Sequence, residues 1–162
     1  IRNLRNCFRR GKLARYMRAI PTLLYGHSDE VSEWVSQQIP EVNNGFQDAT
    51  AIGVISQGKL IAGVVYNEWQ PEYKTMQLNI AATNPMWARK EVIRGLLAYP
   101  FRQIDVFKCW LTIASDNEKS LKMTDHVGFT KEGIMAHQFG KKRHAVIKRM
   151  FKPDYERMWR YE

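Results

Sequence analysis

Cysteine is nearly absent from this sequence of 162 residues, which contains only Cys7 and Cys109. Cys109 stands in an apolar segment and Cys7 in a basic one, so neither a disulfide framework nor a cysteine-rich metal site is predicted. The four histidines are scattered without metal-ligand spacing, and we expect no metal. Long apolar runs are also missing, because stretches such as residues 61–66 are far shorter than the ~20 residues of a membrane-spanning helix. Together these absences favour a protein of the reducing cytoplasm.

Acidic residues are missing from the first 20 positions, which carry seven lysines and arginines. Residues 21–73 carry seven acids and one lysine, and residues 74–162 carry 17 bases and nine acids, so the net charge of +9 is unevenly spread. Basic tracts at both ends would suit nucleic acid or an acidic partner, and they would equally suit a solvated surface or an anionic ligand. A basic, acid-free start also imitates a mitochondrial transit peptide, but the segment Arg9-Arg10-Gly11-Lys12 breaks its apolar periodicity.

The length and the lack of repeats predict one domain, residues 1–162, headed by the basic segment 1–20. Helical periodicity predicts helices over 13–20, 31–39 and 88–101, with Pro100 bending or ending the third. Alternating patterns predict strands over 51–56, 60–69 and 76–82, and Gln57-Gly58-Lys59 turns the first of these into the second.

The second half of the chain has the clearest order. Residues 106–113 have the β-branched and aromatic character of a covered strand. Ser115, Asp116 or Asn117 can cap the helix that follows, and Gly128 is suited to end it. Further strands are predicted over 129–139 and 144–151.

This order, with the motif Asn117-x-x-Ser120 and the step Gly128-Phe129, resembles the second half of the GNAT superfamily of acetyl-CoA-dependent N-acyltransferases. The Trp87-x-Arg89 arrangement and a helix ending in YPF are similar to a divergent phage- and prophage-type branch, over about residues 29–159. The motif spacing is also similar to the branch that acetylates ribosomal-protein N-termini. The resemblance implies an α/β fold with a mostly antiparallel central sheet, helices on both faces and one splayed parallel strand pair. It also implies a viral or prophage source, and hence the host cytoplasm. The family's first strand falls on residues 1–8 or is missing.

The resemblance places acetyl-CoA between strands 76–82 and 106–113, where the backbone of one strand would pair with its pantetheine arm. The residues implied there are Ile80, Ala81 and Ala82. The next loop and helix start would bind the diphosphate, since free N–H groups and the helix dipole favour anions. The residues implied for this part are Trp87, Ala88, Arg89 and Lys90.

That loop departs from the family signature Q/R-x-x-G-x-G/A, whose marked positions fall on Asn84, Trp87 and Arg89. Bulky residues replace both glycines, which normally let phosphates approach the main chain. Contact by the side chains of Arg89 or Lys90, or another path of the loop, would compensate. Alternatively, Trp87 simply fills the core.

Asn117 and Ser120 are implied to bind the pantetheine or phosphate end of the cofactor, although a plain helix cap and an exposed serine would look the same. Acetyl transfer needs a deprotonated amine and a protonated leaving thiolate. The family's tyrosine acid falls on Thr124, which is a poor general acid. Glu68 is the predicted base, directly or through water, ahead of Asp125. A phenol could also come from one of three tyrosines, Tyr66, Tyr73 and Tyr99.

We therefore expect an acetyl-CoA-dependent N-acetyltransferase that uses direct attack by an amine in a ternary complex. Positive termini favour an acidic protein or nucleic acid over a cationic acceptor. Two alternatives keep the fold: a phage-type protein that binds or modifies a DNA base or tRNA, and a catalytically degenerate interaction module.

Overall fold

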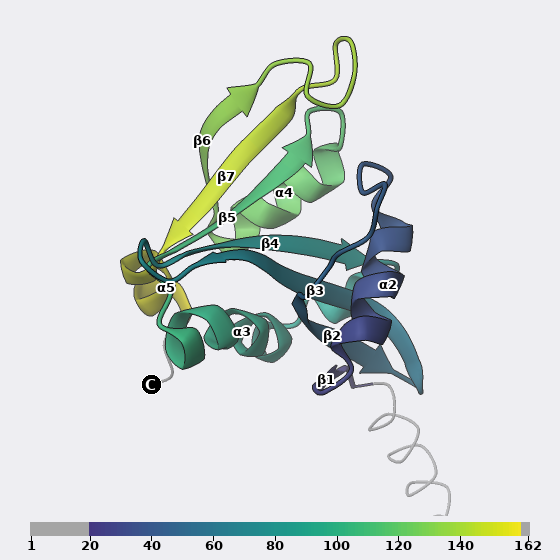
Figure 1. The fold of residues 1–162 in the computed structure, drawn as a ribbon. Coiled ribbons are helices and arrows are strands. Elements are labelled where there is room, and N and C mark those ends of the chain that lie inside the picture. Colours follow the sequence, from purple (N-terminus) through teal and green to yellow (C-terminus); the bar gives the residue numbers. More distant parts are fainter. Residues whose placement is uncertain (1–19, 160–162) are drawn as a thin grey trace, which may run out of the picture.

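The computed structural model describes residues 20–159. Within them seven strands form one sheet of order β1-β2-β3-β4-β5-β7-β6, in which β4 and β5 are the parallel pair (Figure 1). The elements are β1 (Thr22–Leu24), α2 (Ser28–Gln38), β2 (Thr50–Ser56), β3 (Lys59–Gln70), β4 (Thr75–Ala82), α3 (Lys90–Ala98), β5 (Lys108–Ala114), α4 (Glu118–Val127), β6 (Thr130–Met135), β7 (Ala145–Phe151) and α5 (Lys152–Trp159). The predicted mixed α/β architecture is confirmed. No helix in this part of the chain is both long and apolar enough to span a membrane.

Helices cover both faces of the sheet. Neighbouring residues of a strand point to opposite faces, so alternate residues of β3 pack against different helices. Val65 of β3 belongs to the smaller core cluster, which contains Val31 and Val35 of α2. Its neighbours Val64 and Tyr66 belong to the larger cluster. That cluster also contains apolar residues of α3, α4 and α5.

Local sequence signals explain the turn and helix ends that were predicted correctly. Gln57 and Gly58 both have positive φ, 53° and 75°, as the two central residues of a type I′ hairpin turn require. The side chain of Asn117 accepts a hydrogen bond from the Ser120 N–H at 3.2 Å, so Asn117 is the residue that caps α4. Gly128 ends the helix in the left-handed conformation.

The predicted helix over 88–101 is wrong at both ends. Residues Pro85–Trp87 form a separate 3-10 turn, and α3 begins only at Lys90. From Tyr99 the chain continues as a π-helix, Tyr99–Ile104, because Pro100 has no N–H to donate to the carbonyl of Leu96. The Tyr66 hydroxyl donates to that carbonyl instead, at 2.6 Å. This contact holds α3 against β3.

Other boundaries also differ from the prediction. Strand 129–139 ends at Met135, because the next residues form a loop in which backbone N–H groups bond to histidine side chains. Strand 106–113 begins at Lys108, although Val106 is buried. Strand β1 and helix α5 were not predicted. The predicted helix over 13–20, except its last residue, and the alternative first strand over 1–8 lie outside the described residues.

Asp105 joins the end of the π-helix to the turn before β4 and to the start of α5. It ends the π-helix in the left-handed conformation and forms ion pairs with Lys152 and, at 3.0 Å, with Lys74. These two ammonium groups, that of Lys152 first, lower the pKa of Asp105 from 3.8 to about 2.

This pKa predicts a dependence of stability on acid. Because the carboxyl binds its proton more weakly in the folded chain, the free energy of unfolding falls as the pH drops from about 4 to about 2. Asn tolerates the left-handed conformation, so Asp105→Asn should fold and show a shallower loss over this window. Urea unfolding at several pH values measures the difference, which is small because the carboxylate is exposed. Equal acid slopes for the two proteins would contradict the prediction.

Candidate active site

The two parallel strands separate soon after they begin. They pair only at Thr75↔Lys108, Met76↔Cys109 and Gln77↔Trp110, although β4 continues to Ala82 and β5 to Ala114. On its other side β4 stays paired with β3 up to Ala82. The backbone groups of β4 that face β5 therefore have no strand partner beyond Gln77, and the sheet opens as a V (Figure 1).

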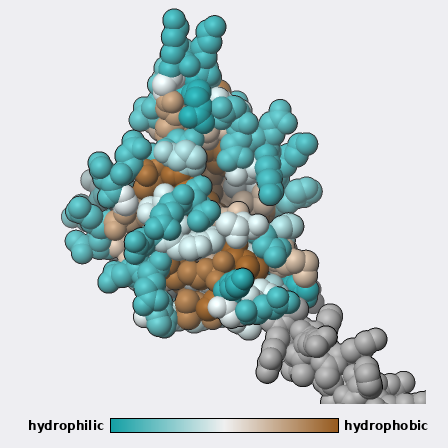
Figure 2. Space-filling view, turned by 90° about the vertical axis from the view of Figure 1, so that its right-hand side faces the viewer, coloured by the Kyte–Doolittle hydropathy of each residue, from teal (hydrophilic) through white to brown (hydrophobic). Residues whose placement is uncertain are grey.

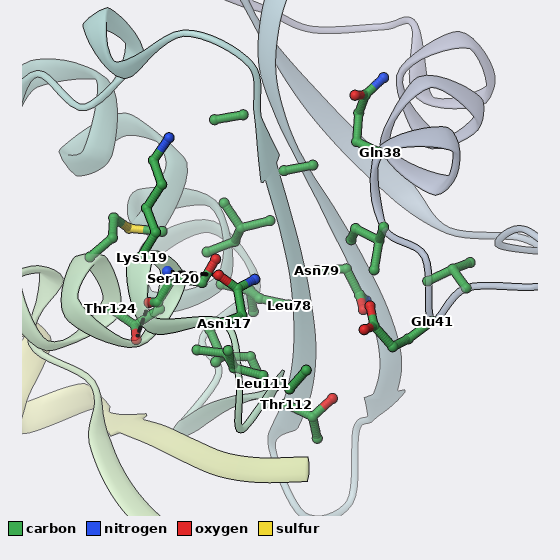
Figure 3. A pocket seen from close by; sticks show the side chains of 18 of the residues that line it. Gln38, Glu41, Leu78, Asn79, Leu111, Thr112, Asn117, Lys119, Ser120 and Thr124 are labelled. Atoms are coloured by element: carbon green, nitrogen blue, oxygen red, sulfur yellow. Dashed lines mark hydrogen bonds between the residues drawn. The ribbon is translucent and has the colours of Figure 1, made fainter. Parts of the chain in front are cut away.

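A cavity of about 550 Å³ lies in this opening. It is lined by residues 38–42 at the end of α2 and directly after it, 77–82 of β4, the turn before α3, 111–114 of β5, Asn117 with four residues of α4, and Phe139. In Figure 3, Asn117, Ser120 and Thr124 gather on one side of the cavity, and Glu41 lies beside Asn79 on the other. Figure 2 looks at the side where the strands have separated and shows hydrophobic surface there among hydrophilic side chains. The cavity thus combines an apolar interior with a few polar groups, as ligand sites commonly do.

Seven of the nine residues predicted to bind the cofactor line this cavity. They are Ile80, Ala81, Ala82, Trp87, Ala88, Asn117 and Ser120. Arg89 and Lys90 are outside its lining: Arg89 is half-buried where α3 begins, and Lys90 is exposed. Among the described residues, one lysine lines the cavity. It is Lys119, which the sequence analysis did not single out.

The turn before α3 uses its own backbone donors. The Met86 N–H donates to the Asn84 side chain at 2.9 Å and the Trp87 N–H to the Asn84 carbonyl at 3.3 Å. The next two N–H groups, of Ala88 and Arg89, donate to carbonyls of the same turn at 3.2 and 2.8 Å. A loop built on glycines would present such N–H groups to an anion, whereas here they are satisfied internally. Trp87 is 5% exposed, so it fills the core and reaches the cavity with only a small part of its surface.

Glu68, the predicted base, does not lie in this cavity. It is exposed at an irregularity of the β3–β4 pairing, with φ of 51°, and lines a second cavity of about 440 Å³ near the closed end of the V. Tyr66 and Tyr99 line that second cavity too, and burial raises the pKa of the Tyr66 phenol. The Asn79 amide of the first cavity donates to the Asn67 side chain of the second at 2.9 Å, so one hydrogen bond links the two linings. The remaining candidates, Tyr73 and Asp125, are exposed.

Glu41 is a site residue that the sequence analysis missed. Within residues 20–159 it is the only carboxylate in the lining of the first cavity, and its side chain is 17% exposed. The Arg143 guanidinium pairs with it at 3.0 Å and with Asp116 at 2.9 Å. These carboxylates, that of Asp116 first, raise the pKa of Arg143, and Arg143 lowers the pKa of Asp116. Arg143 therefore ties together the loop after α2, the turn before α4 and the loop before β7. No local pattern reveals this contact, because Glu41 and Arg143 are 102 positions apart.

A scan against protein-family models finds no match, and a search of curated proteins finds none. Solved structures do match. One is the spermidine/spermine N-acetyltransferase SpeG from Vibrio cholerae in complex with manganese ions, with a TM-score of 0.68 and 16% identity over 90% of this chain and 99% of that chain. Another is a dodecameric spermidine N-acetyltransferase from Vibrio cholerae, with a TM-score of 0.66 and 14% identity over 88% of this chain and 99% of that chain. The chain therefore has the GNAT fold. These structures do not support the narrower resemblance to a phage-type or ribosomal-protein branch.

Proposed function

We propose that this chain is an acetyl-CoA-dependent N-acetyltransferase. The observation that carries the proposal is the cavity between the separated strands of a GNAT fold, with the free edge of β4 on one wall and Asn117 and Ser120 on the other. In the reaction an amine nitrogen attacks the thioester carbonyl directly, the C–S bond breaks, the amine loses a proton and the thiolate gains one.

The residues present fit the arm of the cofactor better than its diphosphate. The amide-bearing pantetheine arm can pair with the unpartnered backbone of β4, and the amide nitrogen of Asn117 is available because its oxygen caps α4. The turn before α3 has already used its N–H groups, so the diphosphate depends on the first N–H groups of α3 and on cationic side chains. Lys119 at the cavity is the first candidate, with Arg89 and Lys90 beyond the lining.

A small cationic amine is the acceptor that fits this cavity. The structural neighbours act on spermidine and spermine, and Glu41 offers a carboxylate within the lining. Because Arg143 contacts Oε1 of Glu41, a protonated nitrogen of a polyamine can pair with the other carboxylate oxygen, Oε2, while a second, neutral nitrogen attacks the acetyl group. The basic segment 1–20, which motivated an acidic or nucleic-acid partner, lies outside the described residues except for Ile20. Spermidine is therefore the first acceptor to test.

The test begins with calorimetric titration of the protein with acetyl-CoA. We expect micromolar binding that Lys119→Ala weakens by roughly tenfold, because a hydrogen bond to a charged group contributes about 1.5–3 kcal/mol. Lys122→Ala is the matched control, since Lys122 is exposed on the same helix but outside the cavity lining. Asn117→Ser should also weaken binding, because it keeps a capping oxygen and removes the amide nitrogen.

Acetyl transfer to spermidine is then followed by the release of free thiol. Release that depends on spermidine would support the enzyme and its acceptor together. Binding without transfer to any amine would reject the acetyltransferase, and no binding at millimolar acetyl-CoA would leave a degenerate fold that acts as an interaction module. Equal affinities of the Lys119 and Lys122 variants would show that another group holds the diphosphate.

A further inference from the structure

Lys148 of β7 is a lysine buried inside the protein, with 3% of its surface exposed. Its ammonium donates to the Leu121 carbonyl at 2.7 Å, to the Thr124 hydroxyl at 2.9 Å and to the Asp125 carboxylate at 2.6 Å. All three partners belong to α4. The strand pattern explains the burial, because Val146 and Met150, two positions away on either side, are buried too.

These contacts form a continuous path from the cavity to solvent. Thr124 lines the cavity and is 2% exposed, and its hydroxyl donates to the Ser120 carbonyl at 2.8 Å, with the Leu121 carbonyl at 3.0 Å as a second acceptor. At the other end, the Asp125 side chain is 67% exposed. A proton can therefore pass from water through Asp125 and the Lys148 ammonium to the Thr124 hydroxyl.

Packing alone does not account for a lysine at this position. A buried charge seldom stabilises a fold more than an apolar side chain of the same volume does, since the ammonium loses most of its hydration. An apolar residue in place of Lys148 would continue the buried row of Val146 and Met150. A charged group at this point thus suits a chemical role beside the cavity.

We propose that Lys148 is a positioning residue that acts through Thr124 to protonate the leaving thiolate, an inference that rests on the proposed function. As the C–S bond breaks, the Thr124 hydroxyl turns its proton from the Ser120 carbonyl to the sulfur, and the oxygen takes a proton from the Lys148 ammonium. Water returns a proton to Lys148 by way of Asp125. A threonine is a poor acid by itself, but here the proton comes from the ammonium behind it.

The test compares two acetyl donors whose leaving groups differ in their need for a proton. Acetyl-CoA releases an alkyl thiolate, which needs one, whereas S-acetyl-4-nitrothiophenol releases an aryl thiolate that is stable without it. For Lys148→Met we expect kcat/KM with spermidine to fall by roughly 100-fold with acetyl-CoA. With the aryl donor it should fall by less than about threefold. Thr124→Val should show the same pattern, and Thr124→Ser, which keeps a hydroxyl, should stay close to the unaltered protein.

A purely structural role for Lys148 would give a different result, since a distorted site slows transfer from both donors alike. Equal losses with the two donors, or no loss with acetyl-CoA, would overturn the relay. Unfolding midpoints and calorimetry with acetyl-CoA check that each variant is folded and binds its donor. Thr124→Val carries the test if Lys148→Met does not fold. If the unaltered protein acetylates no amine with either donor, the proposed function fails as well.

Discussion

Gly63→Val is expected to separate α2 from the sheet and to lower the free energy of unfolding by about 1–3 kcal/mol or more. Gly63 pairs with Gly53 across the β2–β3 hairpin, directly below the helix. A Cβ added at Gly63 would lie 2.8 Å from a methyl carbon of Val35 and 3.0 Å from one of Val31. Both valines are fully buried, so neither can move aside without displacing the helix.

The displacement would also reach the cavity, because α2 leads directly into residues 38–42 of its lining. Gly133→Val is the matched control, since an added Cβ at Gly133 in the edge strand β6 meets no atom within 4 Å. Urea unfolding of both variants measures the difference. Gly63→Ala and Val35→Ala should cost less together than the sum of their separate losses, because Val35→Ala removes the methyl carbon that lies 2.8 Å from the added Cβ. Similar stabilities for the Gly63→Val and Gly133→Val proteins would show that α2 is free to shift.

The elements that sequence could predict are those fixed by their own residues. The β2–β3 hairpin follows from Gln57-Gly58, and α4 from Asn117 at its start and Gly128 at its end. Strand β1 has only three residues, too few for a periodic pattern, and forms because it pairs with β2. Helix α5 did carry a signal, since Pro153 suits a first helical turn and Asp154 accepts a hydrogen bond from the Phe151 N–H. The predicted elements nevertheless ended with the strand over 144–151, and no helix was placed after it.

The site residues also fall into two groups, those that a local sequence pattern predicts and those whose place depends on contacts distant in the sequence. The strand edge and the Asn117-x-x-Ser120 motif were predictable because each lies within one recognisable segment. Glu41 was not, because its place depends on Arg143 from a loop far along the chain. Lys148 had a readable signal, as a charged residue at an inward position of an alternating strand. Glu68 lines the second cavity, at an irregular pairing of β3 and β4 that no residue pattern revealed, and its role as the base stays a prediction.

Trp87→Ala is expected to be among the most damaging single changes, lowering the free energy of unfolding by about 3–5 kcal/mol. The indole is 5% exposed and belongs to the main core cluster, together with residues of α3 and β4. Removing it leaves a void beside the cavity, because the close-packed neighbours cannot collapse fully. Trp87→Phe, which keeps an aromatic ring, should lose much less.

The same variant decides whether Trp87 serves the fold or the ligand. Since nearly all of the ring is covered by core residues, acetyl-CoA affinity measured where the variant is still folded should change far less than stability does. The backbone bonds from Asn84 to the turn do not involve the indole, so they remain available to hold the loop. A stability loss below about 1 kcal/mol together with lost binding would reverse this assignment. The tryptophan would then be part of the binding surface, where it would replace the family's first glycine with an aromatic contact.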